Sequence, residues 1–282
     1  MTVEEGLHRL TEANILSAPI CTSDGQWVGL VDHLDILFWA MKVSTAPVAS
    51  GSDEPSQDVT KDTVGMVMKR MQEFSFTQLG DDISNLSQLN PFKTVKRSSP
   101  LEETLKLFGE GAHRVVVTDD EGTPIHVLTQ SRVLKHLNNY PDRLGSSRDK
   151  GLKELGLISP VVSCKKSELA ITAFRRMMQH RVSGLAVTEE DGELAGNISS
   201  TDVKLMRQFQ YDTLLDSVED YLKVSRPLGG SLVACTDACT LADAVRQMVE
   251  RRVHRVYVVD ESKRAVGIVT LSDVLRIVSA FK

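Results

Sequence analysis

The fold is decided by one stretch of sequence, VHRVYVVDESKRAVGIVTLSDVLRIV, residues 253–278. An apolar strand leads to an acidic turn, a second strand and then a helix in which apolar residues recur at helical spacing. The same order occurs three more times, in ILSAPICTSDGQWVGLVDHLDILFWAM from Ile15, AHRVVVTDDEGTPIHVLTQSRVLKHL from Ala112 and RVSGLAVTEEDGELAGNISSTDVKLM from Arg181. The chain is therefore predicted to be an α/β (α+β) protein built from four copies of one small repeat.

The spacing within the repeats is constant. In every copy 19 positions separate the residue that opens the first strand from a residue early in the helix; these pairs are Leu16 and Asp35, His113 and Arg132, Ser183 and Asp202, and His254 and Asp273. Equivalent positions in copies two, three and four lie 70 and 71 residues apart, whereas copies one and two lie 97 apart. The excess falls in residues 44–63, a stretch rich in Ser, Pro and Asp that is typical of a flexible loop.

Each copy also follows an amphipathic stretch that predicts a helix, clearest in ELAITAFRRMMQHRV and LADAVRQMVERRV. Short extended segments precede the last three copies: FKTVK, PVVSC and SLVAC. Because one repeat cannot cover both faces of so small a sheet, neighbouring repeats are expected to pair. We predict two modules, residues 1–143 with repeats at about 1–43 and 92–143, and residues 144–282 with repeats at about 158–210 and 230–282.

Composition excludes several classes of function. The net charge of -5 argues against broad binding to nucleic acid or to anionic membranes, since both require a clustered positive surface. The N-terminus lacks the basic and apolar regions of a signal peptide, and the longest mainly apolar run, residues 34–41, is too short to span a bilayer. The four cysteines are Cys21, Cys164, Cys235 and Cys239, and no pair has CxxC spacing. We therefore expect reduced thiols and a protein of the cytoplasm, with the nucleus as a further location.

The strand-to-helix turns form the first candidate site. Copies three and four read GNISSTD and GIVTLSD, where Asp202 or Asp273 comes three residues after Ser199 or Thr270. One interpretation is a capping box, which stabilises a helix start by about 1 kcal/mol and needs no ligand. The other is a nucleoside phosphate site. The carboxylate would accept hydrogen bonds from the ribose hydroxyls, and the Ser or Thr hydroxyl and free helix amides would bind phosphate.

Copy two separates these interpretations, because its turn, HVLTQSR, has Arg132 in place of Asp. A positive charge near a helix N-terminus is unfavourable, so a capping box would not select it. Arginine cannot accept hydrogen bonds from ribose hydroxyls, but it binds phosphate through two parallel hydrogen bonds. We predict that this turn, which starts at Thr129, has changed from a sugar site to a phosphate contact.

A second set of basic residues lies at the start of the first strands. Its members are His113 with Arg114, His254 with Arg255, and, in copy three, Arg181 with Ser183. Isolated charges of this kind usually mark a solvated strand edge. Pseudo-symmetric packing would instead gather them around a common axis, where cations repel unless an anion lies among them. Each charge-assisted hydrogen bond to phosphate contributes roughly 1.5 to 3 kcal/mol, so several would outweigh that repulsion.

On these residues the chain resembles proteins with cystathionine-beta-synthase (CBS) motifs, and its four copies look like the gamma regulatory subunit of the AMP-activated protein kinase family. The resemblance covers nearly the whole chain. Its strongest matches are the two His-Arg pairs, the segment QHRVSGLAV, the turn GIVTLSD and the Arg132 substitution. It implies two tandem pairs of CBS motifs, or Bateman modules, that form a flat, pseudo-symmetric disk.

The resemblance also implies ligands, partners and site residues. AMP, ADP and ATP would compete for sites between motifs, without a catalytic cofactor or a metal, and would change how the chain contacts the catalytic and scaffold subunits of a protein kinase. Ribose would be held by Asp35, Asp202 and Asp273, whereas the motif with Arg132 would leave its site unoccupied. Phosphates would be bound by His113, Arg114, Lys135, Arg181, Ser183, His254 and Arg255, with the turn residues Thr129, Arg132, Ser199 and Thr270 beside them.

Copy one departs from the family pattern. It has Leu16 where family members often carry a cation, and Asp32 where they carry Ser or Thr. Asp32 can still cap a helix, but it places negative charge beside the expected phosphate, so the Asp35 site ranks below those of Asp202 and Asp273. The chain also starts almost within the first helix, and we expect a strand to precede residue 1 in the complete protein.

Three functions remain open from the sequence. The leading one is an energy-sensing regulatory subunit of a protein kinase. The alternative is an orphan CBS-pair protein that binds another adenosyl ligand, such as S-adenosylmethionine, and regulates an enzyme or transporter. The third is a scaffold whose turns only cap helices. Enzymatic activity is not expected, because each His-Arg dipeptide is followed by Val and not by the Asp of a kinase catalytic loop.

Overall fold

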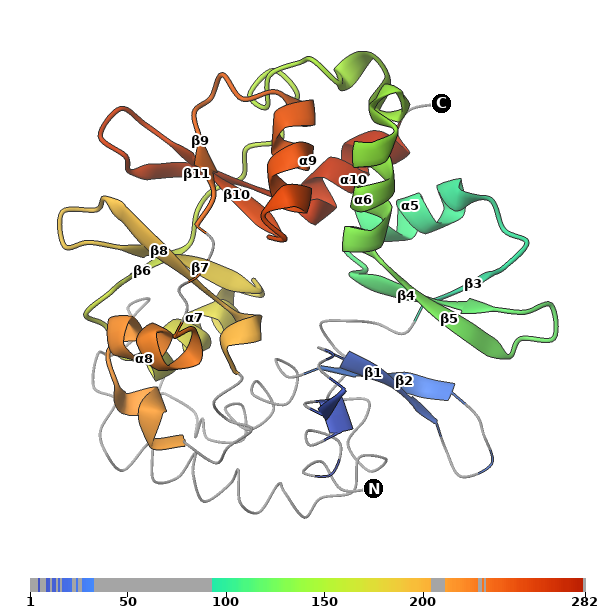
Figure 1. The fold of residues 1–282 in the computed structure, drawn as a ribbon, viewed down its shortest axis with the longest axis horizontal. Coiled ribbons are helices and arrows are strands. Elements are labelled where there is room, and N and C mark those ends of the chain that lie inside the picture. The colour runs from blue at the N-terminus through green and yellow to red at the C-terminus, as the bar shows by residue number, and fades with distance from the viewer. Residues whose placement is uncertain are drawn as a thin grey trace, which may run out of the picture. The chain divides into compact units, whose positions relative to one another are not determined.

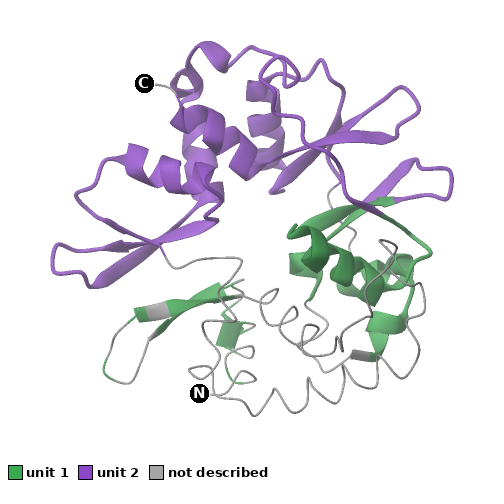
Figure 2. Cartoon of the chain, turned by 180° about the vertical axis from the view of Figure 1, so that it is seen from behind, with its two compact units in different colours: residues 1–89, 164–187, 197–229 green, residues 90–163, 188–196, 230–282 purple. Residues whose placement is uncertain are grey.

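The structure of the chain is a computed structural model that describes residues 93–203, 211–227, 230 and 232–280, together with residues 5, 9–10, 12–13, 15, 17–21, 24 and 27–32. Figure 1 shows the elements in their order along the chain. The chain divides into two compact units, drawn in different colours in Figure 2. Unit 1 comprises residues 1–89, 164–187 and 197–229, and unit 2 comprises residues 90–163, 188–196 and 230–282.

The β-hairpins of copies one, two and four share one register. Their strands are β1 (Ser17–Cys21) with β2 (Trp27–Asp32), β4 (Arg114–Thr118) with β5 (Pro124–Thr129), and β10 (Arg255–Val259) with β11 (Ala265–Thr270). Each pair is antiparallel, and the first residue of one strand lies opposite the last residue of the other. In all three the register shifts just before the final pair. The hairpin of copy one therefore has the same strand pairing as those of copies two and four.

A short third strand extends the sheets of the last three copies. β3 (Thr94–Lys96) and β9 (Ala234–Cys235) pair in parallel with β4 and β10. In copy three, β6 (Ser163–Lys165), β7 (Gly184–Thr188) and β8 (Leu194–Ser199) form a sheet in that order. These added strands are the segments FKTVK, PVVSC and SLVAC, so their predicted extended structure is confirmed.

The helices lie where the apolar spacing predicts them. α5 (Leu101–Gly109) and α6 (Gln130–Asn139) flank the hairpin of copy two, α7 (Ala170–His180) precedes that of copy three, and α9 (Leu241–Glu250) and α10 (Leu271–Ser279) flank that of copy four. Other described helices include η1 (Pro141–Ser147), η3 (Tyr211–Leu215) and α8 (Val218–Ser225). Within the described part of the chain, no helix is both long and apolar enough to cross a membrane.

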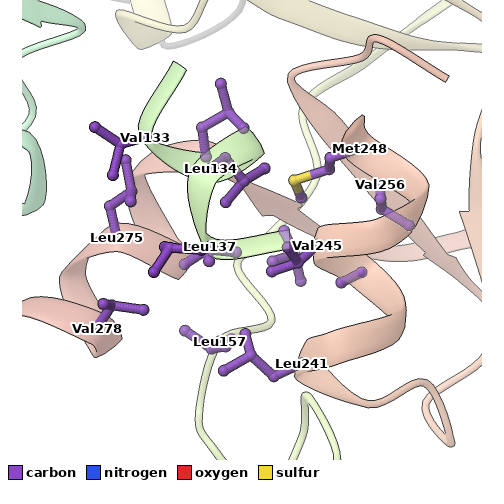
Figure 3. Close-up of a cluster of buried hydrophobic side chains, with 14 of the residues drawn as sticks. Val133, Leu134, Leu137, Leu157, Leu241, Val245, Met248, Val256, Leu275 and Val278 are labelled. Atoms are coloured by element: carbon purple, nitrogen blue, oxygen red, sulfur yellow. The ribbon is translucent and has the colours of Figure 1, made fainter. Parts of the chain in front are cut away.

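The core of unit 2 joins the helices of copies two and four. α5 and α6 pack against α10, and α6 also packs against α9. Their apolar side chains meet in one cluster, part of which is drawn in Figure 3, and each fully buried Val or Leu stabilises the fold by roughly 1.5 to 3 kcal/mol. The cluster includes Val133, Leu134 and Leu137 from α6, Leu241, Val245 and Met248 from α9, and Leu275 and Val278 from α10. Helix packing thus holds repeats two and four together.

A buried amide also links these two repeats. The side chain of Gln130 donates to the Ala112 carbonyl at 2.9 Å and to the Ser272 hydroxyl of α10 at 2.9 Å. Because buried polar groups need partners, this network favours one relative position of α6 and α10.

In unit 1, α7 and α8 pack through two buried aromatic rings. Phe174 and Tyr221 meet edge to face, with centroids 5.5 Å apart. The Tyr221 hydroxyl donates to the backbone carbonyl of Asp202 at 2.7 Å. α8 is thereby attached to the turn of copy three.

The predicted mixed α/β fold, built from repeats of strand, strand and helix, is confirmed. The predicted division into modules 1–143 and 144–282 stays a prediction. The two compact units do not follow chain order, since unit 2 combines the helices of copies two and four. Asp35 and the loop at residues 44–63 lie outside the described residues. Among the described residues, Cys164, Cys235 and Cys239 form no disulfide bond.

Candidate functional site

In copy four the start of the strand and the start of the helix lie side by side. Arg255 is the register partner of Thr270, and the amide of Leu271 donates to the carbonyl of His254 at 3.2 Å. The same two contacts recur at the equivalent residues of copy two. Each predicted His-Arg pair therefore lies next to the predicted turn of its own repeat.

The structure also brings the His-Arg pairs of copies two and four together within unit 2. His254 interacts electrostatically with Arg255 of its own strand and with His113 and Arg114 of copy two. We call these four residues the cation cluster. Protein atoms surround the His254 ring although water still reaches it, and this desolvation, reinforced by the neighbouring basic groups, lowers its pKa from 6.5 to about 4. The imidazole is therefore neutral at pH 7 and can donate one hydrogen bond without adding positive charge.

One nitrogen of the cation cluster is left without an acceptor. Nη1 of Arg114 is buried and has no hydrogen-bond partner among the described residues. A buried charged donor without a partner is costly, and native proteins rarely contain one. An anion placed among the cluster would supply the acceptor and offset the repulsion between the basic groups.

Asp273 caps a helix and still keeps one oxygen outward. Its Oδ2 accepts hydrogen bonds from the Thr270 amide at 2.9 Å and the Thr270 hydroxyl at 2.6 Å, and together they form a capping box. Its Oδ1 accepts from the exposed Arg276 side chain at 3.1 Å. The capping and ribose interpretations are therefore compatible at this turn, because the cap uses only one carboxylate oxygen.

Asp202 makes a similar turn but is closed by another residue. Its Oδ2 accepts from the Ser199 amide at 2.7 Å and the Ser199 hydroxyl at 2.9 Å. In addition, the guanidinium of Arg226 donates to both carboxylate oxygens of Asp202. Sequence reasoning missed Arg226, because it follows α8, outside the repeat motif, and no local pattern relates it to Asp202.

The other predicted residues occupy separate places. Thr129 caps α6 by accepting from the Arg132 amide at 3.3 Å, while the side chains of Arg132 and Lys135 are exposed on that helix. Arg181 is an exposed residue after α7, and the Ser183 carbonyl accepts from the Ser200 amide at 3.0 Å. Both belong to unit 1, and their proposed phosphate contacts stay predictions.

Comparison with known proteins establishes the family. The model of the CBS domain matches residues 83–139, 152–206 and 219–280, which is more than half of the chain. The chain therefore belongs to the CBS domain family. The matched segments are repeats two, three and four, whereas repeat one is recognised by the register of its hairpin.

Relatives extend the likeness to nearly the whole chain. The SNF1-related protein kinase regulatory subunit gamma-1 of Arabidopsis thaliana is 24% identical over 323 residues, covering 97% of this chain and 76% of that protein. Protein SDS23 of Kluyveromyces lactis is 29% identical, covering 69% of this chain and 45% of that protein. The chain thus spans about half the length of the SDS23 proteins that it matches.

Solved structures share the fold. A Methanocaldococcus jannaschii protein, described as a candidate archaeal homologue of g-AMPK, superposes with a TM-score of 0.68 at 18% identity, covering 98% of this chain and 92% of that chain. An uncharacterized Pyrococcus horikoshii protein superposes with a TM-score of 0.55 at 17% identity, covering 93% of this chain and 91% of that one. At this identity the likeness concerns the fold alone.

Proposed function

We propose that this chain is a non-catalytic regulatory subunit of a protein kinase and senses energy by binding AMP, ADP or ATP. The proposal is carried by the cation cluster of unit 2, in which Nη1 of Arg114 is buried and lacks an acceptor within the described part of the chain. A phosphate group fits this need, because its oxygens accept several charge-assisted hydrogen bonds of roughly 1.5 to 3 kcal/mol each.

The sugar half of the ligand would bind at the neighbouring turn. Among the described residues, Oδ1 of Asp273 accepts a hydrogen bond only from Arg276, whose side chain is exposed, and such surface pairs contribute about 0 to 1 kcal/mol. Ribose hydroxyls can displace that contact. Because Arg255 pairs with Thr270 at the same turn, a nucleotide held at Asp273 would direct its phosphate toward the cation cluster.

Binding studies test the nucleotide part of the proposal. Calorimetry of nucleotide-free protein should give saturable binding of AMP, ADP or ATP, and Arg255→Ala should abolish the binding at Asp273. Arg246→Ala is the matched control, because this exposed arginine lies in the same unit but pairs with Asp243. No heat from any of the three nucleotides at millimolar concentration would end the proposal. Binding of S-adenosylmethionine that survives Arg255→Ala would instead favour the adenosyl alternative.

The kinase part is supported by the likeness to the Arabidopsis gamma subunit. We expect the tagged full chain, expressed in the cytoplasm of its own cells, to co-purify with the catalytic and scaffold subunits of a protein kinase. Adding AMP or ATP to the complex should change kinase activity, and Arg255→Ala should remove that response. Purification without any kinase chain would contradict this part while leaving nucleotide binding intact.

A further inference from the structure

Two equivalent aspartates of the repeat differ in solvent exposure and in their arginine partner. Asp202 and Asp273 occupy the same position of copies three and four, and each uses Oδ2 to cap the helix that follows. Yet the side chain of Asp202 is 2% exposed and that of Asp273 is 12% exposed. The difference comes from the arginine that each one contacts.

Arg226 contacts both carboxylate oxygens of Asp202. Its Nε donates to Oδ1, and its Nη2 donates to Oδ2 and, at 3.3 Å, to the Ser199 hydroxyl. With the two bonds from Ser199, the carboxylate accepts four hydrogen bonds, which is about its full number of lone-pair sites. Three of these bonds fall on Oδ2 and one on Oδ1, so two ribose hydroxyls cannot both bind Asp202 while Arg226 stays in place.

The position of Arg226 is set by α8. The helix starts at its cap, Ser217, and is attached to the turn by Tyr221, whose hydroxyl bonds the Asp202 carbonyl. Arg226 follows the last helical residue, and its amide donates to the Leu222 carbonyl at 2.9 Å. The side chain thus reaches Asp202 from a helix that is already attached to the same turn.

Arg226 is also the outer member of the pair. Its side chain is 21% exposed, whereas that of Asp202 is almost fully covered. A long arginine side chain at such a position can turn into water, but the capped carboxylate cannot follow it. The net stability of a largely buried ion pair is small once desolvation is counted, so a ligand that replaces its hydrogen bonds can compete.

We propose that Arg226 is a latch on the third repeat: it occupies the ribose acceptor Asp202, and a nucleotide enters this site only by displacing the guanidinium. This inference rests on the proposed function. It predicts unequal sites, with the Asp273 site filling first and the Asp202 site filling at higher nucleotide concentration.

Calorimetric titration with AMP and with adenosine tests the latch. Arg226→Ala should tighten the weaker, Asp202-dependent binding by about tenfold, which corresponds to 1.4 kcal/mol. Asp202→Ala and Asp273→Ala identify which binding step belongs to which site. Arg276→Ala is the matched control, since it removes the exposed arginine from Asp273 and should change affinity less than about twofold.

A second variant, Arg226→Lys, controls for misfolding of Arg226→Ala. Arg226→Ala leaves a buried carboxylate unpaired, whereas Arg226→Lys keeps the charge and loses the two-pronged contact. The lysine variant should fold normally and tighten Asp202-dependent binding by a smaller factor. Thermal unfolding without ligand reports whether each variant is folded.

The outcomes separate the latch from the proposed function. If nucleotide binds at Asp273 but both Arg226 variants leave Asp202-dependent binding unchanged or weaker, Arg226 is not a latch, and weaker binding would make it a ligand contact. If folded wild-type protein binds nothing at Asp273 either, the proposed function itself fails, because that site has no latch. Tighter binding at Asp202 in both variants supports the inference.

Discussion

At the level of single residues, Arg114 favours anion binding and lowers the stability of the ligand-free protein. Its buried Nη1 has no acceptor among the described residues, and it lies in a cluster with other basic groups. Both features favour an anion and disfavour the empty protein. A binding site of this kind is maintained at the expense of stability, as is common where a ligand completes the hydrogen bonding.

Arg114→Met should therefore separate stability from binding. We expect the ligand-free variant to be more stable by about 1 kcal/mol, because an apolar side chain removes the buried Nη1 donor that has no acceptor among the described residues. Phosphate binding should be lost. Urea denaturation and nucleotide titration measure the two effects, with Arg246→Met as an exposed control. A variant that is less stable and still binds nucleotide would contradict the assignment.

His254 predicts how stability depends on pH. Its pKa is about 4 in the folded protein and 6.5 in the unfolded chain, so the unfolded chain binds more protons between these values. The stability of ligand-free protein should fall as pH falls from about 6.5 to 4. His254→Asn should remove this part of the pH dependence, which urea denaturation at several pH values would reveal. An unchanged pH profile in the variant would refute the role of His254.

At the scale of elements, two helix starts offer a comparison. Thr240 with Asp243 and Thr270 with Asp273 form the same capping box at α9 and α10, but only the second lies beside the cation cluster. Capping and ligand binding can therefore be separated by experiment.

Asp243→Ala and Asp273→Ala should each cost roughly 1 kcal/mol of stability, since each removes half of a capping box. Only Asp273→Ala should also lose the stabilisation that added AMP provides. Thermal unfolding with and without AMP measures both effects. Equal AMP responses in the two variants would mean that Asp273 is a cap and nothing more.

Strand β11 has a close approach that requires glycine. A Cβ on Gly267 would lie 2.0 Å from Cγ2 of Ile158, because residue 159 forms two backbone hydrogen bonds with Ile268. Gly267→Ala should destabilise the protein by about 1 to 3 kcal/mol, and adding Ile158→Ala should recover part of that loss. Gly151→Ala is a control, because its nearest neighbour would be 3.9 Å away. Denaturant midpoints of the three variants, compared with that of the wild type, test the clash.

At the scale of the whole molecule, the helices of copies two and four form the core of unit 2 and also place their His-Arg pairs in one cluster. A ligand that bridges the cluster should therefore stabilise both repeats together. At a concentration 100 times the dissociation constant, binding adds about 2.7 kcal/mol to stability.

Hydrogen exchange should show where that stabilisation acts. With AMP we expect slower exchange in β4, β10 and β11 and at the start of α10, while the segment around Asp202 responds only at higher concentration. Arg226→Ala should remove that lag. Slower exchange confined to repeat four would contradict a site shared with repeat two.

The repeat could be predicted from the sequence: each copy consists of strand, acidic turn, strand and helix, and the helix residue Arg132 or Asp273 follows the histidine of its His-Arg pair by 19 positions. These features act between near neighbours, through apolar spacing and helix capping, so a linear pattern contains them. Three features could be seen only in the folded chain. Repeats two and four share a helical core, His254 interacts with His113 and Arg114, and Arg226 binds the carboxylate of Asp202. Such contacts depend on how whole helices pack, and a side chain brought in by a neighbouring helix leaves no mark on the motif that it closes.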